Sequence, residues 1–224
     1  MILSKRQQLV FDQLNDLKPE YIIGIDETGT GSLIGDVYVG AFLAPTKWTL
    51  KGIDDSKELT PVKRDNLATQ LMVVARENGF GASIVHCHTD DKDRFKDYGT
   101  NLHSCLKFLY YTAVSRLLDI APITVKRSYA IILDGIIKFP NTPNYLGTSF
   151  SLPKGDALIP QISAASIISK VTRDAYMDNL HIKYPNYNLN ENRGYPTKDH
   201  LEALKKFGIC KEHRTTYKPI KKFL

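Results

Sequence analysis

YIIGIDETGTGSLIGDVYVG, residues 21–40, predicts a strand, an acidic tip, a compact turn and a returning strand. The apolar run ends in two adjacent acids, Asp26 and Glu27, and the turn Gly29-Thr30-Gly31 follows. The two glycines let backbone N–H groups approach a ligand with no Cβ in the way. Two acids at a strand end indicate a metal or proton-transfer site at the rim of a sheet. A hairpin with a polar turn explains these residues alone equally well.

Size and composition bound the class of protein. The 224 residues allow one large domain or one domain with a small appendage, and 42% hydrophobic with 24% charged residues predict a packed core. A net charge of +6 favours a polyanionic partner, although a merely basic protein has the same balance. The three scattered cysteines argue against a disulfide framework or a zinc site. The N-terminus lacks a signal-peptide core and no apolar run has membrane-spanning length, so we expect a soluble cytoplasmic protein.

Helical and strand periodicities divide the rest of the chain. Strands before residue 90 follow short turns and one helix, whereas later strands are joined through helices, so we expect a mixed sheet with helices on both faces. Small residues in segment 159–180 would let that helix lie close to the sheet, and the charged segment 90–97 is typical of a solvated helix or loop. The expected helices are 1–18, 60–78 (inner face Val62, Leu67, Leu71 and Val74), 101–118, 159–180 and 199–207; the other expected strands are 37–43, 82–86 and 128–133, and a loop should run from 136 to about 153.

Two further acids occupy positions like those of the first pair. Asp134 ends the apolar run 128–133, and Asp156 lies at a glycine corner. If these strand ends are adjacent, four carboxylates converge, which requires a bound cation or raised pKa values. Oxygen-only ligation suits Mg²⁺ or Mn²⁺, and two such ions form a clamp for the attack of water on a phosphodiester. Taken singly, each acid is better explained as a strand-end cap or a solvated loop residue than as a metal ligand.

The chain resembles the ribonuclease HII family, the type 2 ribonucleases H, from about residue 21 to about residue 217. The resemblance lies in IDETGTGSLIGDVYVGAF, DDSKELTPVKRDNL, ILDG, KGDALIPQISAASIISKVTRDAYMDNL, YPNYNLNENRGYPTKDHLEALKKFG and HRTTY, which occur in family order. It implies an α/β ribonuclease H-like fold, with a mixed five-stranded sheet flanked by helices and a helical C-terminal part. Residues 1–224 would form one catalytic domain, in which about 180–224 contribute to substrate binding.

The resemblance also implies an activity. Asp26, Glu27, Asp134 and Asp156 would be the catalytic, metal-binding carboxylates, holding two Mg²⁺ or Mn²⁺ ions. The substrate would be an RNA–DNA hybrid or a DNA duplex with embedded ribonucleotides, cut on the 5′ side of a ribonucleotide to leave a 3′-hydroxyl. A non-catalytic duplex-binding module is disfavoured, because such a protein would lack one of the carboxylates.

One departure from the family pattern concerns the glycine loop. The family usually has G-R-G or G-K-G, whereas Gly29-Thr30-Gly31 is typical of the related type 3 enzymes. The loop amides could still bind the ribose and its phosphate, but the cationic contact of the middle residue is lost. The alternative is therefore a type 3-like hybrid nuclease with little activity on single ribonucleotides.

Other residues are candidates for substrate contact. Tyr195 matches the tyrosine that the family places against the junction sugar, although a tyrosine after glycine also suits loop packing. Lysine side chains usually form a solvated face, and Arg173 alternatively serves the fold. The histidines are interpreted as structural, a monomer is expected, and the C-terminal KKFL does not support a sliding-clamp contact. The candidates for phosphate contact are Ser56, Lys57, Lys154, Lys170 and Arg173, and those for diffuse attraction of the duplex are Lys198, Lys205, Lys206 and Arg214.

Overall fold

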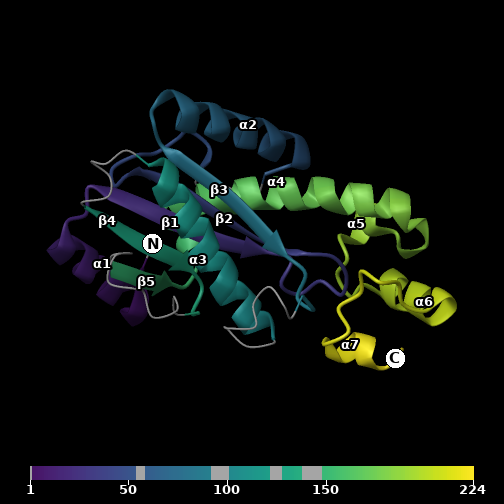
Figure 1. Ribbon diagram of the computed structural model, residues 1–224. Coiled ribbons are helices and arrows are strands. Elements are labelled where there is room, and N and C mark those ends of the chain that lie inside the picture. Colours follow the sequence, from purple (N-terminus) through teal and green to yellow (C-terminus); the bar gives the residue numbers. More distant parts are fainter. Residues whose placement is uncertain (1, 54–58, 92–100, 122–127, 138–147) are drawn as a thin grey trace.

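A five-stranded mixed sheet forms the centre of the computed structural model, which describes residues 2–53, 59–91, 101–121, 128–137 and 148–224 (Figure 1). The strand order is β3-β2-β1-β4-β5. β1 pairs antiparallel with β2, and β2 with β3, whereas β1, β4 and β5 run parallel. The strands are β1 (Tyr21–Thr28), β2 (Val37–Pro45), β3 (Gly81–Cys87), β4 (Tyr129–Asp134) and β5 (Thr148–Leu152).

Helices cover both faces of this sheet, as the sequence predicts. α3 packs against one face, where Ile23 and Ile25 of β1 point. α1, α2 and α4 cover the other face, where Ile22 points. Consecutive residues of β1 therefore alternate between the two helical layers, which also determines where its acids point. The helices of this part are α1 (Lys5–Leu17), α2 (Pro61–Glu77), α3 (Leu102–Ile120) and α4 (Pro160–Lys183).

Local sequence signals set the starts of several helices. Ser4 forms a capping box with Gln7 at the start of α1, and Thr60 accepts a hydrogen bond from the Lys63 amide at the start of α2. Of the residues predicted to form the inner face of α2, Leu67 and Leu71 are buried, as expected, but Val62 is not. Val62 lies in the first turn, where its side chain is 69% exposed.

Two strand predictions need correction. β1 does not end before its acids but continues through them to Thr28, because Asp26 and Glu27 keep their pairing with Gly40 and Val39 of β2. The loop expected from 136 to about 153 contains β5 at its end. The alternation of polar and apolar residues in TSFSL is the signal for this edge strand.

The C-terminal part is helical, as expected, and packs against the loop that follows β1. Leu33 and Ile34 of that loop lie in one apolar cluster with Met177 of α4 and Ile220. Ile34 also forms an isolated β-bridge with His213. The elements here are a 3₁₀ turn (Pro185–Tyr187), α5 (Leu189–Asn192), α6 (Lys198–Phe207) and α7 (Lys218–Lys221).

The segment expected to be a solvated charged stretch is tied to the C-terminal part at its described end. The Asp90 carboxylate accepts hydrogen bonds from the Thr215 amide at 2.6 Å and from the Thr216 hydroxyl at 2.9 Å. These bonds lower the pKa of Asp90, although its burial acts in the opposite direction. Residues 92–97 lie outside the described part of the chain. No helix of the described part is long and apolar enough to cross a lipid bilayer.

Candidate active site

Asp26 of β1 points into the layer of α4. Its carboxylate is hydrogen-bonded by the Ser166 hydroxyl of α4 and accepts the Glu27 amide at 2.8 Å. Burial raises the pKa of Asp26 to about 8, and the negative charges of Glu27 and Asp134 raise it further against the effect of these donors. Asp26 therefore holds a proton at neutral pH unless a cation or a donor offsets its burial.

Glu27 points to the opposite face, into the layer of α3. The hydroxyl of Tyr110, a fully buried residue of α3, donates to Glu27 Oε2 at 2.7 Å. Burial raises the pKa of Glu27, the Tyr110 hydrogen bond lowers it, and the charge of Asp134 raises it. Burial and the neighbouring Glu27 carboxylate also raise the pKa of Tyr110, so this phenol stays a donor. In the sequence, Tyr110 looks like one more buried residue of an amphipathic helix, so its contact with Glu27 could not be predicted.

Asp134 is linked to the turn that carries Asp156. Asp134 ends β4, next to β1, and its Oδ1 accepts the Gly155 amide at 2.6 Å. Asp156 follows in the 3₁₀ turn Gly155–Ala157, where its side chain is 4% exposed. The structure thus brings Asp26, Glu27 and Asp134 into electrostatic contact, and the Gly155 amide joins Asp134 to the turn that carries Asp156.

The acids are held in their orientations by hydrogen-bond donors of the protein, and they do not form a ready-made metal-binding cluster. Within the described residues, no three His, Cys, Asp or Glu side chains are gathered closely enough to hold a metal ion. The carboxylates of Asp26, Glu27 and Asp134 are instead held by Ser166, Tyr110 and the Gly155 amide. Their all-oxygen donor set and shared negative charge nevertheless fit a hard divalent cation by chemistry.

Close packing of α4 on the sheet brings Ser166 to Asp26. A Cβ on Gly24 would lie 2.2 Å from the backbone of Gln161, and one on Gly40 would lie 2.3 Å from the Ala165 carbonyl oxygen. Only glycine fits at these two strand positions, because the α4 backbone fills the space of a side chain. The small buried residues of α4 complete this contact, as the sequence predicts: Ser163, Ala164, Ala165 and Ser169.

The two glycines of the loop after β1 differ in what requires them. Gly29 is buried with φ +84°, and a Cβ there would lie 2.0 Å from Nε of Arg173. Gly31 is exposed and has no such backbone constraint, since a Cβ there would make only an ordinary 3.5 Å contact with the Tyr195 ring. The protein itself therefore demands glycine at position 29 but leaves room for a side chain at position 31.

Arg173, predicted to contact phosphate, is fully buried behind this loop. Its guanidinium donates to the Arg193 carbonyl at 3.1 Å and to the Asp36 carbonyl at 3.4 Å, and it lies 5.7 Å from the centroid of the Tyr195 ring. Burial lowers the pKa of Arg173. Tyr195 is 36% exposed, so its ring can meet a ligand on the side away from the protein.

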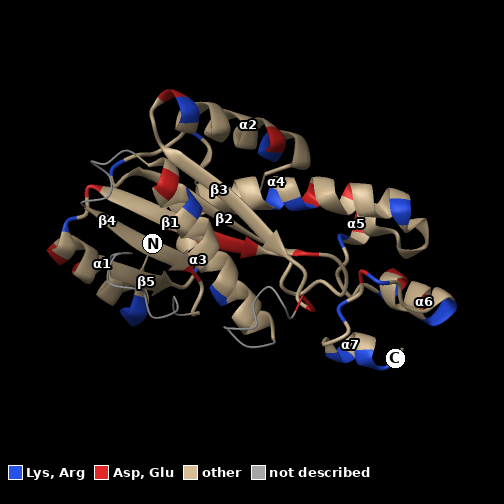
Figure 2. Cartoon of the chain, viewed as in Figure 1, with Lys and Arg blue, Asp and Glu red and all other residues tan. Residues whose placement is uncertain are grey.

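The other predicted contact residues are dispersed. Lys170 forms an i,i+4 ion pair with Asp174 at 2.6 Å, and Lys154 is exposed in a left-handed backbone conformation before the turn of Asp156. Ser56 and Lys57 lie outside the described residues. Figure 2 shows the Lys and Arg residues of α6 and α7 at the C-terminal end of the molecule, away from the acids of β1. Lys198, Lys205 and Lys206 are exposed there, as their predicted role requires.

The prediction that Arg214 attracts the duplex from the surface is wrong. Its side chain is fully buried, and its guanidinium donates to the carbonyls of Gly29 at 2.7 Å and Gly35 at 2.8 Å. Tyr217, for which the sequence carries no signal of such a role, donates to the Thr30 carbonyl at 2.7 Å. A basic residue in a basic tail is expected to lie in solvent. The burial of Arg214 is explained by carbonyl groups of the loop after β1, which is distant in sequence.

A buried pair of histidines joins Tyr195 to the segment of Arg214. The Cys210 amide donates to His213 Nδ1 at 2.9 Å, which leaves His213 Nε2 to carry the proton facing His200 Nε2 at 3.4 Å. His200 Nδ1 then donates to the Tyr195 carbonyl at 3.0 Å. Burial lowers the pKa of both rings, that of His213 to about 4 with a contribution from His200, so the pair is neutral at pH 7. These two histidines are structural, as the sequence predicts.

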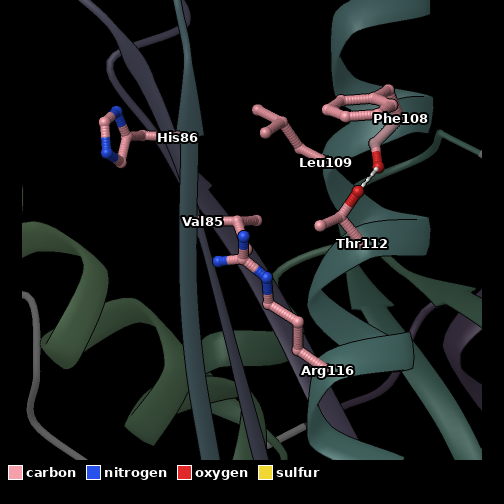
Figure 3. A pocket seen from close by; sticks show the side chains of 6 residues that line it. All are labelled: Val85, His86, Phe108, Leu109, Thr112 and Arg116. Carbon is pink, nitrogen blue, oxygen red and sulfur yellow. Dashed lines mark hydrogen bonds between the residues drawn. The ribbon is translucent and has the colours of Figure 1, made fainter. Parts of the chain in front are cut away.

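Two cavities of the described part contain none of the candidate site residues. One, of about 320 Å³, lies between β3 and α3, where Arg116 and Thr112 face Val85 (Figure 3). The other, of about 890 Å³, is lined by α1, the start of β1 and the N-terminus of α4. Neither cavity is therefore part of the candidate site, whose acids lie on β1, at the end of β4 and in the turn Gly155–Ala157.

Comparison with solved structures places this fold in the ribonuclease H class. Ribonuclease H2 from Pyrococcus horikoshii OT3 is 24% identical with a TM-score of 0.67, covering 91% of this chain and 96% of that one. Bst-RNase HIII in complex with Mn²⁺ is 20% identical with a TM-score of 0.69, covering 93% and 70%. At these identities the likeness shows the fold alone.

Sequence comparison then defines the family. The family model of ribonuclease HII matches residues 23–220. Ribonuclease HII of Shewanella loihica is 33% identical over 218 residues, which cover 97% of this chain and 97% of that protein. The chain therefore belongs to the ribonuclease HII family and is an endoribonuclease.

Proposed function

We propose that this protein is a divalent-metal-dependent endoribonuclease that hydrolyses the RNA strand of RNA–DNA hybrids and ribonucleotides embedded in duplex DNA. The cut falls on the 5′ side of a ribonucleotide and leaves a 3′-hydroxyl. The observation that carries the proposal is the group of Asp26, Glu27 and Asp134, in which burial, together with the charges of the other two acids, raises the pKa of Asp26 to about 8. Such a group is stable as carboxylates only with a cation beside it.

Four carboxylates would hold the cations in this account: Asp26, Glu27, Asp134 and Asp156. Bound Mg²⁺ or Mn²⁺ would activate water and neutralise charge at the phosphodiester. Asp26 and Glu27 would approach from the two faces of one strand, with Ser166 and Tyr110 holding each carboxylate in its orientation. The donors are strong enough to fix the side chains, yet they leave lone pairs on each carboxylate.

The rim beside the acids would bind the sugar of the ribonucleotide. Gly31 is exposed beside the Tyr195 ring, so a ribose lying over the two would meet the loop amides and the aromatic ring together. Lys154 and Lys170 are accessible for phosphate contact. The lysines of α6 would attract the duplex at longer range, within one catalytic domain in which residues from about 180 extend the binding surface.

Thr30 favours a second candidate, a type 3-like nuclease that prefers ribonucleotide runs. A threonine hydroxyl is neutral and short, whereas arginine would add a charge-assisted phosphate contact of about 1.5–3 kcal/mol. We therefore expect single embedded ribonucleotides to be cut less efficiently than runs of several, where neighbouring sugars offer alternative registers.

The experiment compares two DNA duplexes, one with a single ribonucleotide and one with four in a row, at saturating Mg²⁺ or Mn²⁺. We expect both to be cut, the second more efficiently, and neither in EDTA. Thr30→Arg should raise kcat/KM on the single ribonucleotide more than on the run, while Thr30→Gln, which adds length without charge, should not. Failure to cut either duplex with either metal would contradict the proposed function. Faster cutting of the single ribonucleotide, unchanged by Thr30→Arg, would contradict only the role of the loop side chain.

A further inference from the structure

The carbonyl groups of the glycine loop point into the protein and are held there from behind. Arg214 donates from Nη1 to the Gly29 carbonyl at 2.7 Å, and the Tyr217 hydroxyl donates to the Thr30 carbonyl at 2.7 Å. Arg214 is fully buried and its Nε is fixed on the Gly35 carbonyl at 2.8 Å. The two donors are joined, since Arg214 Nη1 also lies 3.1 Å from the Tyr217 hydroxyl.

These contacts determine where the loop amides point. In a trans peptide the C=O and N–H bonds are directed oppositely, and the structure has no cis peptide bonds among its described residues. Inward carbonyls of Gly29 and Thr30 therefore turn the amides of Thr30 and Gly31 outward. Neither amide donates a hydrogen bond to any described residue, and Gly31 lies on the exposed side of the loop.

Within the loop itself, the Ser32 amide donates to the Gly29 carbonyl at 3.2 Å, and Arg214 reinforces this bond from behind. The Thr30 carbonyl is held by the Tyr217 hydroxyl and, at 3.4 Å, by Arg214 Nη1. Glycine flanks Thr30 on both sides, so the two peptide planes can rotate at little steric cost. Burial of the Arg214 charge against the Gly29 carbonyl also polarises that peptide and strengthens its N–H as a donor. Arg214 thereby acts on the same loop that lacks a basic side chain at position 30.

We propose that Arg214 and Tyr217 are positioning residues for ribose recognition: they hold the 29–30 and 30–31 peptides so that the Thr30 and Gly31 amides face the ribonucleotide. The inference rests on the proposed function, because the substrate sugar is the ligand of these amides. It assigns to residues 214–217 a part in discriminating ribose from deoxyribose, without any contact between these residues and the sugar.

The test compares two tyrosines that make the same kind of bond. Tyr217→Phe removes the hydroxyl that donates to Thr30, and Tyr187→Phe removes a hydroxyl that donates to the Gly208 carbonyl at 3.1 Å in the same apolar cluster. Binding of each protein is measured by fluorescence anisotropy in EDTA, with a duplex containing one ribonucleotide and with the all-DNA duplex of the same sequence. The ratio of the two Kd values measures discrimination and is insensitive to a uniform loss of folded protein.

We expect Tyr217→Phe to reduce this ratio about fivefold, as the loss of one hydrogen bond predicts, and Tyr187→Phe to leave it unchanged. Arg214→Lys, which keeps the charge but cannot serve both the Gly29 and the Gly35 carbonyl, should reduce the ratio at least as much. A wild-type preference that both Tyr217→Phe and Arg214→Lys leave unchanged would overturn the inference alone. Absence of any preference in the wild type would instead overturn the proposed ribonucleotide specificity, and the inference with it. If Arg214→Lys does not fold, Tyr217→Phe decides.

Discussion

Replacement of Asp26 by asparagine should stabilise the protein in the absence of divalent cations. The pKa of Asp26 rises from 3.8 to about 8 on folding, chiefly because the carboxyl is buried. The folded protein thus takes up a proton between these pH values, and its stability falls as pH rises from about 4 to about 8. The destabilisation reaches at most about 6 kcal/mol above that window. Asparagine removes this cost, because it has the same shape and no charge.

Urea denaturation in EDTA at about pH 4 and about pH 8 measures the effect. We expect Asp26→Asn to gain at least about 2 kcal/mol over the wild type at the higher pH and almost nothing at the lower. Asp12→Asn, which changes an exposed acid of α1 that accepts a hydrogen bond from the Gln8 side chain, is the matched control and should show no such difference. Added Mg²⁺ should then stabilise the wild type more than Asp26→Asn, by mass action. Equal unfolding free energies of Asp26→Asn and wild type at the higher pH would refute the reasoning.

Three further predictions follow from the loop, the acids and the surface charge. Gly31→Ala should keep the wild-type Tm but lower kcat/KM on the single-ribonucleotide duplex about tenfold or more, because its methyl group enters the space beside Tyr195. Gly29→Ala should instead lose about 2–4 kcal/mol of unfolding free energy, because its φ is +84° and its methyl group would clash with Arg173. Tyr110→Phe should leave Glu27 without its hydroxyl donor and raise the pKa of that acid, so the acidic limb of the pH–rate profile should move to higher pH; an unchanged profile would contradict this. The affinity for all-DNA duplex should fall linearly with salt on a log–log plot, with a slope of about −0.9 for each phosphate contacted, and a flat plot would show that the net charge of +6 is incidental.

Sequence patterns predict the parts of this protein that depend on neighbouring residues. The apolar run of β1, the caps of α2 and the small residues of α4 each carry their own signal, and the structure confirms these elements. The edge strand β5 escaped prediction because it has only five residues and is half-buried, so its alternation is weak. Local sequence patterns therefore predict the central strands and the helices packed on them, but not the edge strand of the sheet.

The supporting contacts of the candidate site could not be predicted in this way. Tyr110 meets Glu27 from 83 positions away, and Arg214 meets Gly29 from 185 positions away. In the sequence, the first looks like core and the second like a basic tail, and only tertiary structure separates these interpretations. The strand-end and glycine-corner patterns indicated the four carboxylates and the family resemblance gave their expected role, but neither supplied the donors that orient them.

Cleavage by Asp134→Asn tests the central claim, a single metal-dependent site made by acids from separate segments. Asparagine keeps the Oδ1 that accepts the Gly155 amide, so the fold and duplex binding should be preserved. The measurement is single-turnover cleavage of a hybrid duplex with saturating Mg²⁺, beside the wild type and the surface control Asp12→Asn. The account predicts a rate at least about a hundredfold below wild type for Asp134→Asn, with the same Kd, and an unchanged rate for the control. A rate near that of the wild type for Asp134→Asn would contradict it.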